Sequence, residues 1–186
     1  MIYPIIIYGS PVLRKRALEI PQDYKGLPTL IADMFETMEI SDGVGLAAPQ
    51  IGKSLRLFVI DATPLSEDDP TLNGFRKAFV NPQIIEETGE KWGYTEGCLS
   101  LPEIREEIER PSTIKIQYYD ENFNFFEEMY DGVKARIIQH EYDHLEGILL
   151  IDRVSPLKKK LLRGKLNNIS KGKVKANYKT KILMKQ

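Results

Sequence analysis

Apolar side chains recur every three or four residues over two stretches of the chain, the spacing of one face of an α-helix. In the first stretch they are Leu27, Leu30, Ile31, Met34, Phe35 and Met38, and the pattern stops at Asp42-Gly43. In the second they are Val133, Ile137, Ile138, Tyr142 and Leu145. We predict one helix over each stretch, the second beginning near Asp131 and ending at Gly147.

Shorter apolar segments lie between these two helices and have the composition of β-strands. Leu55–Ile60 is continuously apolar at its core and predicts a buried strand. Phe79-Val80 and Ile84-Ile85 predict two short strand pieces, separated by Asn81-Pro82.

A β-hairpin is predicted further along the chain. Apolar and polar residues alternate over Ile114–Tyr119, and Asp120-Glu121-Asn122 supplies turn residues before the aromatic run Phe123–Phe126. Strands therefore dominate the middle of the chain and helices its flanks, which favours an α+β fold over alternating β-α-β units.

The two ends of the chain complete this pattern. Ile5–Ile7 predicts a short strand, and Ser10-Pro11 has the cap and first-turn residues of a helix start. Ser155-Pro156 predicts a C-terminal helix with three leucines on one face and lysines on the other, the leucines being Leu157, Leu161 and Leu162.

The composition is that of an ordinary globular protein. With 186 residues, 42% hydrophobic and 28% charged, the chain predicts one domain over residues 1–186 with its own core. A single cysteine excludes an internal disulfide and indicates a reducing compartment. The first apolar run is too short for a signal peptide or a membrane span, so we expect a cytoplasmic protein.

Charge is distributed unevenly, although the net charge is only −1. Twelve of the 26 Lys and Arg residues, and none of the 27 Asp and Glu residues, lie from Arg153 onward. A basic helix and tail from about residue 155 are typical of a solvated amphipathic helix with a frayed end, or of a segment that attracts polyanionic RNA. The second interpretation makes the ribosome a partner. No membrane or DNA partner is expected.

The predicted helix over 131–147 contains the sequence HEYDH, and its His140 and His144 are the only two histidines in the chain. Four residues apart, they lie on one helical face and can bind one metal ion. Glu141 is rotated by about 100° around the helix, so it can flank the metal without ligating it. In this pattern the glutamate acts as general base for a metal-bound water, whereas an ordinary core helix would only hydrogen-bond its histidines.

A catalytic site of this kind needs a third protein ligand and an open position. Downstream of His144 only Glu146 and Asp152 offer a ligand atom, and residues 153–186 contain no His, Cys, Asp or Glu. Cys98, which follows Gly97, is the only thiol, and a metal ion would deprotonate it. We therefore predict Cys98 as the third ligand, rather than an inert buried cysteine.

Residues 43–50 read GVGLAAPQ and are rich in small side chains. A phosphate-binding loop needs a glycine where Ala47 stands and a helix afterwards, so nucleotide binding is not expected. Gly43 and Gly45 let a second backbone lie close, as when an extended peptide pairs with a strand edge, or they form a plain helix-to-strand turn. Gln50 presents an amide donor in the first interpretation.

Together, GVGLAAPQ (43–50), EGCLS (96–100) and HEYDH (140–144) resemble the three signature motifs of the peptide deformylase family, in the same order. The resemblance implies an α+β fold in which antiparallel sheets surround a central metal-binding helix, with a C-terminal helix. It also implies that the formyl group is removed from the N-terminal formylmethionine of new bacterial polypeptides, with release of formate.

The same resemblance implies a metal and a set of residue roles. The metal is Fe²⁺, with Ni²⁺, Co²⁺ or Zn²⁺ able to occupy the site, whereas the ligand types alone indicate only a borderline divalent ion. The backbone N–H of Leu99 and the amide of Gln50 face the formyl oxygen, and Glu141 acts as base and then acid. The peptide lies along Gly45, and Ile137 helps to form the methionine pocket.

Two other functions fit parts of the sequence. A metallopeptidase using the same helix would take Glu146 or Asp152 as its third ligand. An RNA-binding protein with a structural metal site would need a fourth ligand, for which the sequence offers no obvious residue.

Overall fold

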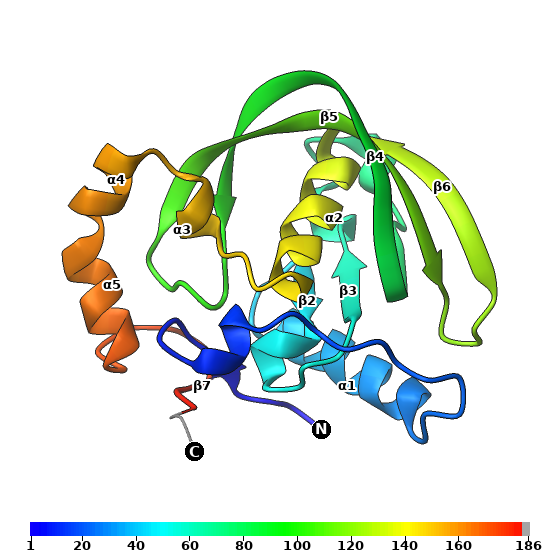
Figure 1. Cartoon of the computed structure of the whole chain (residues 1–186), viewed down its shortest axis with the longest axis horizontal. Helices are drawn as coiled ribbons and strands as arrows, with labels where there is room; N and C mark the ends of the chain where they lie inside the picture. Colours follow the sequence, from blue (N-terminus) through cyan, green and yellow to red (C-terminus); the bar gives the residue numbers. More distant parts are fainter. Residues whose placement is uncertain (184–186) are drawn as a thin grey trace.

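The computed structural model describes residues 1–183 and has an α+β architecture built on a five-stranded antiparallel sheet (Figure 1). The strands, in their order across the sheet, are β2 (Gly45–Ala47), β3 (Leu57–Asp61), β4 (Arg76–Gly97), β5 (Arg105–Tyr119) and β6 (Phe125–Asp131). In Figure 1 the long strands β4 and β5 arch over helix α2 (Gly132–Leu145). The predicted α+β fold with the histidine-bearing helix at its centre is confirmed.

Both helices predicted from the three- and four-residue spacing are present, as α1 (Leu27–Ile40) and α2. Helix α2 buries apolar side chains in the same core cluster as residues of β3, β4 and β5, among them Ala135, Ile138, Leu145, Phe58, Phe79, Ile114 and Ile116. Each fully buried apolar side chain of this size stabilises the fold by about 1.5–3 kcal/mol. The core therefore fixes the position and rotation of α2.

Strand β4 is continuous, so the prediction of two short pieces broken at Asn81-Pro82 is wrong. Asn81 has a positive φ of 50°, and the register with β5 shifts beside it. Its side-chain amide bonds both the N–H and the C=O of Ile20, each at 2.8 Å. These hydrogen bonds hold Asn81 in place at the register shift, which acts as a β-bulge, so the strand continues instead of ending. It reaches Gly97 and leaves Cys98 immediately beyond its end.

The predicted hairpin is confirmed as β5 and β6. The Asp120 side chain forms the turn by accepting hydrogen bonds from the N–H groups of Asn122 at 2.8 Å and Asn124 at 2.9 Å. Phe123, expected at the start of the second strand, instead lies in the turn with a φ of 60°. Strand β6 therefore begins two residues later, at Phe125.

The predicted C-terminal helix begins at Pro156 as expected but is divided into α4 (Pro156–Leu161) and α5 (Arg163–Ser170), and a short helix, α3 (Leu150–Arg153), precedes it. Of the three leucines predicted to share one face, Leu157 and Leu161 are 68% and 76% exposed, whereas Leu162 is partly buried. The α4–α5 segment is attached to the core through Leu162, Leu166 and Ile169.

The first and last strands of the described residues lie side by side. Strand β1 (Ile5–Ile6) pairs in parallel with β7 (Thr180–Lys181), so the prediction of a frayed end is wrong for these residues. Ser10-Pro11 begins only a single 3₁₀ turn, Pro11–Arg14. The last residues of the predicted basic tail, 184–186, lie outside the described part. Among residues 1–183, no helix has both the length and the apolar character that crossing a membrane requires.

Candidate metal centre

The two histidines lie one turn apart on α2, with ring centroids separated by 5.3 Å. The helix begins directly after β6, where Asp131 is still extended and Gly132 has a φ of 53°. This tight start, together with the buried apolar face of α2, fixes which side of the helix faces the end of β4.

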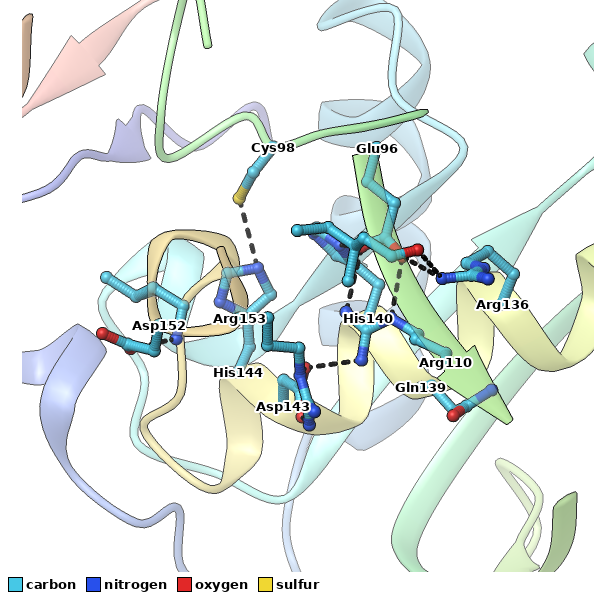
Figure 2. A network of polar contacts seen from close by, with 12 residues as sticks. Glu96, Cys98, Arg110, Arg136, Gln139, His140, Asp143, His144, Asp152 and Arg153 are labelled. Atoms are coloured by element: carbon cyan, nitrogen blue, oxygen red, sulfur yellow. Dashed lines mark hydrogen bonds and ion pairs between the residues drawn. The ribbon is translucent and has the colours of Figure 1, made fainter. Parts of the chain in front are cut away.

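Cys98 lies opposite the two histidines (Figure 2). Its Sγ is 3.3 Å from His144 Nε2, and one ligand atom from each of Cys98, His140 and His144 lies within 4.8 Å of the others. Two ligands at adjacent corners of a tetrahedral ion, with bonds of about 2.0–2.3 Å, are separated by about 3.5 Å. The three residues thus have the chemistry and the spacing to hold one divalent cation.

The other two candidate ligands are committed elsewhere. Glu146 pairs with Arg56 at 2.6 Å and with Arg16 at 3.1 Å. Asp152 pairs with Arg14 and accepts the N–H of Leu149 at 2.9 Å. Neither belongs to the ligand cluster found in residues 1–183. The arrangement that the metallopeptidase alternative requires is therefore absent from this part of the chain.

The orientation of His140 is fixed by Glu96, whose Oε2 lies 2.9 Å from His140 Nδ1. This contact leaves Nε2 free for a metal, which is the arrangement of carboxylate–histidine pairs around metal ions. Glu96 is itself held by Arg110, at 2.7 and 2.9 Å, and by Arg136 at 3.0 Å. Burial alone would raise the pKa of Glu96, but hydrogen bonds from His140 and Arg110 hold it well below its usual range.

Arg110 connects this carboxylate to a second one on α2. Its side chain is 1% exposed, and its other nitrogen lies 2.8 Å from Asp143. Asp143 also pairs with Arg153 at the end of α3 (Figure 2). The chain of charges therefore ties the end of β4, the middle of β5, α2 and α3 together around the ligands. Glu96 and Asp143 lie in motifs that the sequence singled out, EGCLS and HEYDH, but nothing in the sequence pairs either of them with Arg110.

Glu141 lies beside the ligand cluster and is 4% exposed. Burial raises the pKa of its carboxyl group to about 7, and a bound cation would lower it again. Within residues 1–183 its Oε2 is buried without a hydrogen-bond partner, as is Nδ1 of His144. An unsatisfied buried carboxylate oxygen is costly and is characteristic of a group whose partner is a water, an ion or a substrate.

Gly45 packs directly against this carboxylate. A Cβ built on Gly45 would lie 2.3 Å from Oε1, 2.7 Å from Cδ and 2.8 Å from Cγ of Glu141. Among residues 1–183 the space that a Cβ at Gly45 would need is thus filled by the Glu141 side chain. The pairing of an extended peptide with this strand stays a prediction. A Cβ built on Gly43 would be similarly close to Leu99, at 2.9 Å from its Cδ1.

Gln50 and Leu99 both lie next to Cys98, Gln50 in space and Leu99 along the chain. Gln50 Oε1 accepts the N–H of Ala47 at 2.8 Å, and its Nε2 lies 3.2 Å from Ser100 Oγ and 3.7 Å from Cys98 Sγ. Leu99 follows the end of β4, and its N–H forms no hydrogen bond to the residues that the structure describes. Hydrogen bonds to Ala47 and Ser100 hold the Gln50 amide in place, and a donor stabilises charge on a reacting oxygen best when the fold positions it beforehand.

The centre forms one wall of a cleft of about 450 Å³. All the residues to which the family resemblance gives a role line it except His144, namely Gly45, Gln50, Cys98, Leu99, Ile137, His140 and Glu141. Ile137 is 7% exposed and contributes an apolar surface on the α2 side. Tyr178, from the C-terminal segment, also lines the cleft and was not expected there.

A thiol and two imidazoles beside a buried carboxylate, at the wall of a cleft in an α+β fold, define a mononuclear metal-dependent hydrolase. The family model described as "Polypeptide deformylase" matches residues 2–160. The chain belongs to the peptide deformylase family, metalloenzymes that hydrolyse the N-formyl group of nascent peptides.

Individual relatives agree over nearly the full length. The chain is similar to peptide deformylases of Christiangramia forsetii, at 53% identity over 96% of this chain and 95% of the relative, and of Cytophaga hutchinsonii, at 50% identity over all of both chains. Among solved structures, peptide deformylase from Thermus thermophilus superimposes with a TM-score of 0.82 at 39% identity, covering 93% of this chain and all of that chain.

Proposed function

We propose that this protein removes the formyl group from the N-terminal formylmethionine of newly synthesised polypeptides and releases formate. The observation that carries the proposal is the convergence of Cys98, His140 and His144 within 4.8 Å, beside a buried Glu141 with an unpartnered oxygen among residues 1–183. Family membership supports the reaction, and this geometry supports the assignment of residues to it.

The proposed ligands are Cys98, His140 and His144, and the proposed ion is Fe²⁺, with Ni²⁺, Co²⁺ or Zn²⁺ as substitutes in a purified sample. One thiolate and two imidazoles suit a borderline divalent ion of this series. When bound, such an ion lowers the pKa of a water ligand and polarises a carbonyl group. Metal analysis after anaerobic purification identifies the ion.

Glu141 is the proposed general base and acid. Its carboxylate is buried, it lies one residue from a ligand, and Gly45 restricts its side chain. It accepts a proton as water attacks the formyl carbon and returns the proton to the leaving amine. Leu99 N–H and the Gln50 amide are the proposed donors to the formyl oxygen, where negative charge develops.

The peptide beyond methionine is proposed to lie along β2. This strand is at the edge of the sheet, with β3 on one side only among the described strands, so an extended peptide can add to its free edge. Gly45 is its first residue. The methionine side chain then points toward the apolar α2 side of the cleft, which includes Ile137 and Val133.

The test is formate release from formyl-Met-Ala by the metal-loaded protein. Glu141→Ala is expected to reduce the rate by at least about 100-fold while keeping its metal, because the base is lost and the ligands are untouched. Glu106→Ala is the matched control, since Glu106 lies outside the cleft lining and, within residues 1–183, pairs only with Lys158. No formate from the metal-loaded wild type would exclude the proposal.

Two further measurements, alanine release from unformylated Met-Ala and the metal content of Cys98→Ser, distinguish a deformylase from the metallopeptidase alternative. A peptidase would release alanine from Met-Ala and would keep its metal in Cys98→Ser. A deformylase leaves Met-Ala intact, and loss of the thiolate ligand removes most of the metal.

We also propose that the basic C-terminal segment associates with ribosomal RNA. Several of its charges are engaged, as in the pairs Lys158–Glu106 at 2.9 Å and Lys159–Asp152 at 3.2 Å. Lys160 and Arg163 are exposed and form no ion pair within residues 1–183. Ribosome co-sedimentation should weaken steeply with salt, and Lys160→Glu with Arg163→Glu should weaken it further. Ribosome binding whose strength does not change with salt concentration would contradict the proposed association with RNA.

A further inference from the structure

The C-terminal segment returns to the cleft after α5. Lys179 C=O accepts the N–H of Ile5 at 2.8 Å, and β7 continues this pairing with β1. Asn177 Nδ2 donates to Oδ2 of Asp42, a residue of the cleft lining, at 2.8 Å, and the N–H of Leu183 donates to Ser10 Oγ at 3.0 Å. Residues 177–183 are therefore anchored at several points along their length, and Tyr178 lies between two of these anchors.

Tyr178 reaches the segment that follows β4. Its hydroxyl donates a hydrogen bond to the carbonyl oxygen of Leu99 at 2.9 Å. The neighbouring carbonyls are held by backbone donors, since Cys98 C=O accepts from Leu101 N–H and Ser100 C=O from Tyr8 N–H, both at 2.9 Å. Three consecutive carbonyl groups are thus fixed, and Leu99 is the one whose donor is a side chain.

We propose that Tyr178 is a positioning residue for the deformylation reaction, because its hydroxyl fixes Leu99 between the ligand thiol and Ser100. The inference rests on the proposed role of the Leu99 N–H, which follows the ligand Cys98 directly in the chain. The Leu99 N–H shares a rigid peptide plane with the Cys98 carbonyl, which the N–H of Leu101 holds, and Tyr178 holds the next plane through the Leu99 carbonyl. Without the Tyr178 bond this second plane can rotate, which loosens the Leu101–Cys98 hydrogen bond and lets the donor turn away from the reacting oxygen.

The Tyr178 hydroxyl is protonated, as a hydrogen-bond donor to the Leu99 carbonyl must be. The ring is half-buried and packs against the cluster that contains Met38 and Leu46. Burial, with a smaller contribution from Cys98, raises the pKa of Tyr178 to about 12. The hydroxyl therefore keeps its proton at neutral pH and remains a donor.

The test compares Tyr178→Phe with Tyr24→Phe. Tyr24 packs against the same cluster, and its hydroxyl forms no hydrogen bond within residues 1–183, so its loss is a matched control. Steady-state kinetics with formyl-Met-Ala, metal content and hydrogen exchange of the Leu101 amide are measured on each full-length protein. The exchange measurement does not depend on activity.

For Tyr178→Phe we expect kcat to fall about 3- to 10-fold, with KM within about twofold of wild type and full metal content. Exchange of the Leu101 amide should accelerate by a similar factor, and Tyr24→Phe should change neither quantity. An unchanged kcat, an unchanged exchange rate, or a rise in KM alone would overturn the inference. If wild type releases no formate, the proposed function fails first, while the exchange rate still decides whether Tyr178 anchors Leu99.

Discussion

Replacing Gly45 by alanine tests whether the position of the Glu141 carboxylate controls the reaction. The new Cβ would lie 2.3 to 2.8 Å from three atoms of the Glu141 side chain, whereas ordinary contacts begin near 3.4 Å. The Gly45 backbone is held by its pairing with Ile60 in β3 and cannot move away easily. Glu141 must therefore shift by roughly 1 Å, and a displacement of this size at a reacting group costs about 100-fold in rate.

The effect on stability should be much smaller than the effect on rate. Overpacking of this kind costs about 1–3 kcal/mol in the free energy of unfolding. No ligand atom is among the nearest described neighbours of the added methyl group, so the metal should stay bound.

Formate release at saturating and limiting substrate, metal content and thermal unfolding together check this prediction. Gly164→Ala is the control, because a Cβ at Gly164 meets no atom of residues 1–183 within 4 Å. As Gly164 lies inside α5, alanine there should raise stability by up to about 1 kcal/mol and leave the rate unchanged. Gly45→Ala with a rate within about threefold of wild type would refute the reasoning, as would a loss of rate that only follows a loss of metal.

Three further predictions concern the surroundings of the site. Glu96→Gln removes the negative charge that pairs with Arg110. It should lower the free energy of unfolding by about 3–5 kcal/mol in a denaturant titration, and weaken metal binding about 10- to 100-fold in a metal titration. Gln50→Ala should lower kcat by about 100- to 1,000-fold without loss of metal; a smaller effect would exclude it as a donor to the oxyanion. Leu166→Ala should cost about 2–5 kcal/mol, whereas Leu161→Ala, at an exposed position, should change stability by less than about 0.5 kcal/mol.

Periodicity predicted the elements with a single, strongly apolar face. Helices α1 and α2 appear where the three- and four-residue spacing placed them, since burial of one face decides a helix independently of distant residues. The β5–β6 hairpin was predictable because Asp120 forms the turn through neighbours within four residues. The residues of the three motifs were all identified, and the structure brings them to one place.

Features that depend on distant residues were not predictable. The amide of Asn81 finds Ile20 across 61 positions, which converts an apparent break into a bulge. The separation of α4 from α5 depends on which side of each helix reaches the core, and β7 exists only because β1 offers it an edge. The role of Arg110 could not be predicted from its neighbours in the sequence, because the two carboxylates that it binds lie on other elements.

The pairing of β1 with β7 joins residues 5–6 to residues 180–181, nearly the whole chain apart in sequence. During synthesis β1 therefore cannot pair until β7 has been made, and the Tyr178 contact to Leu99 forms at the same late stage. An enzyme proposed to process other emerging chains thus completes this part of its own architecture only after residues 180–181 have been synthesised.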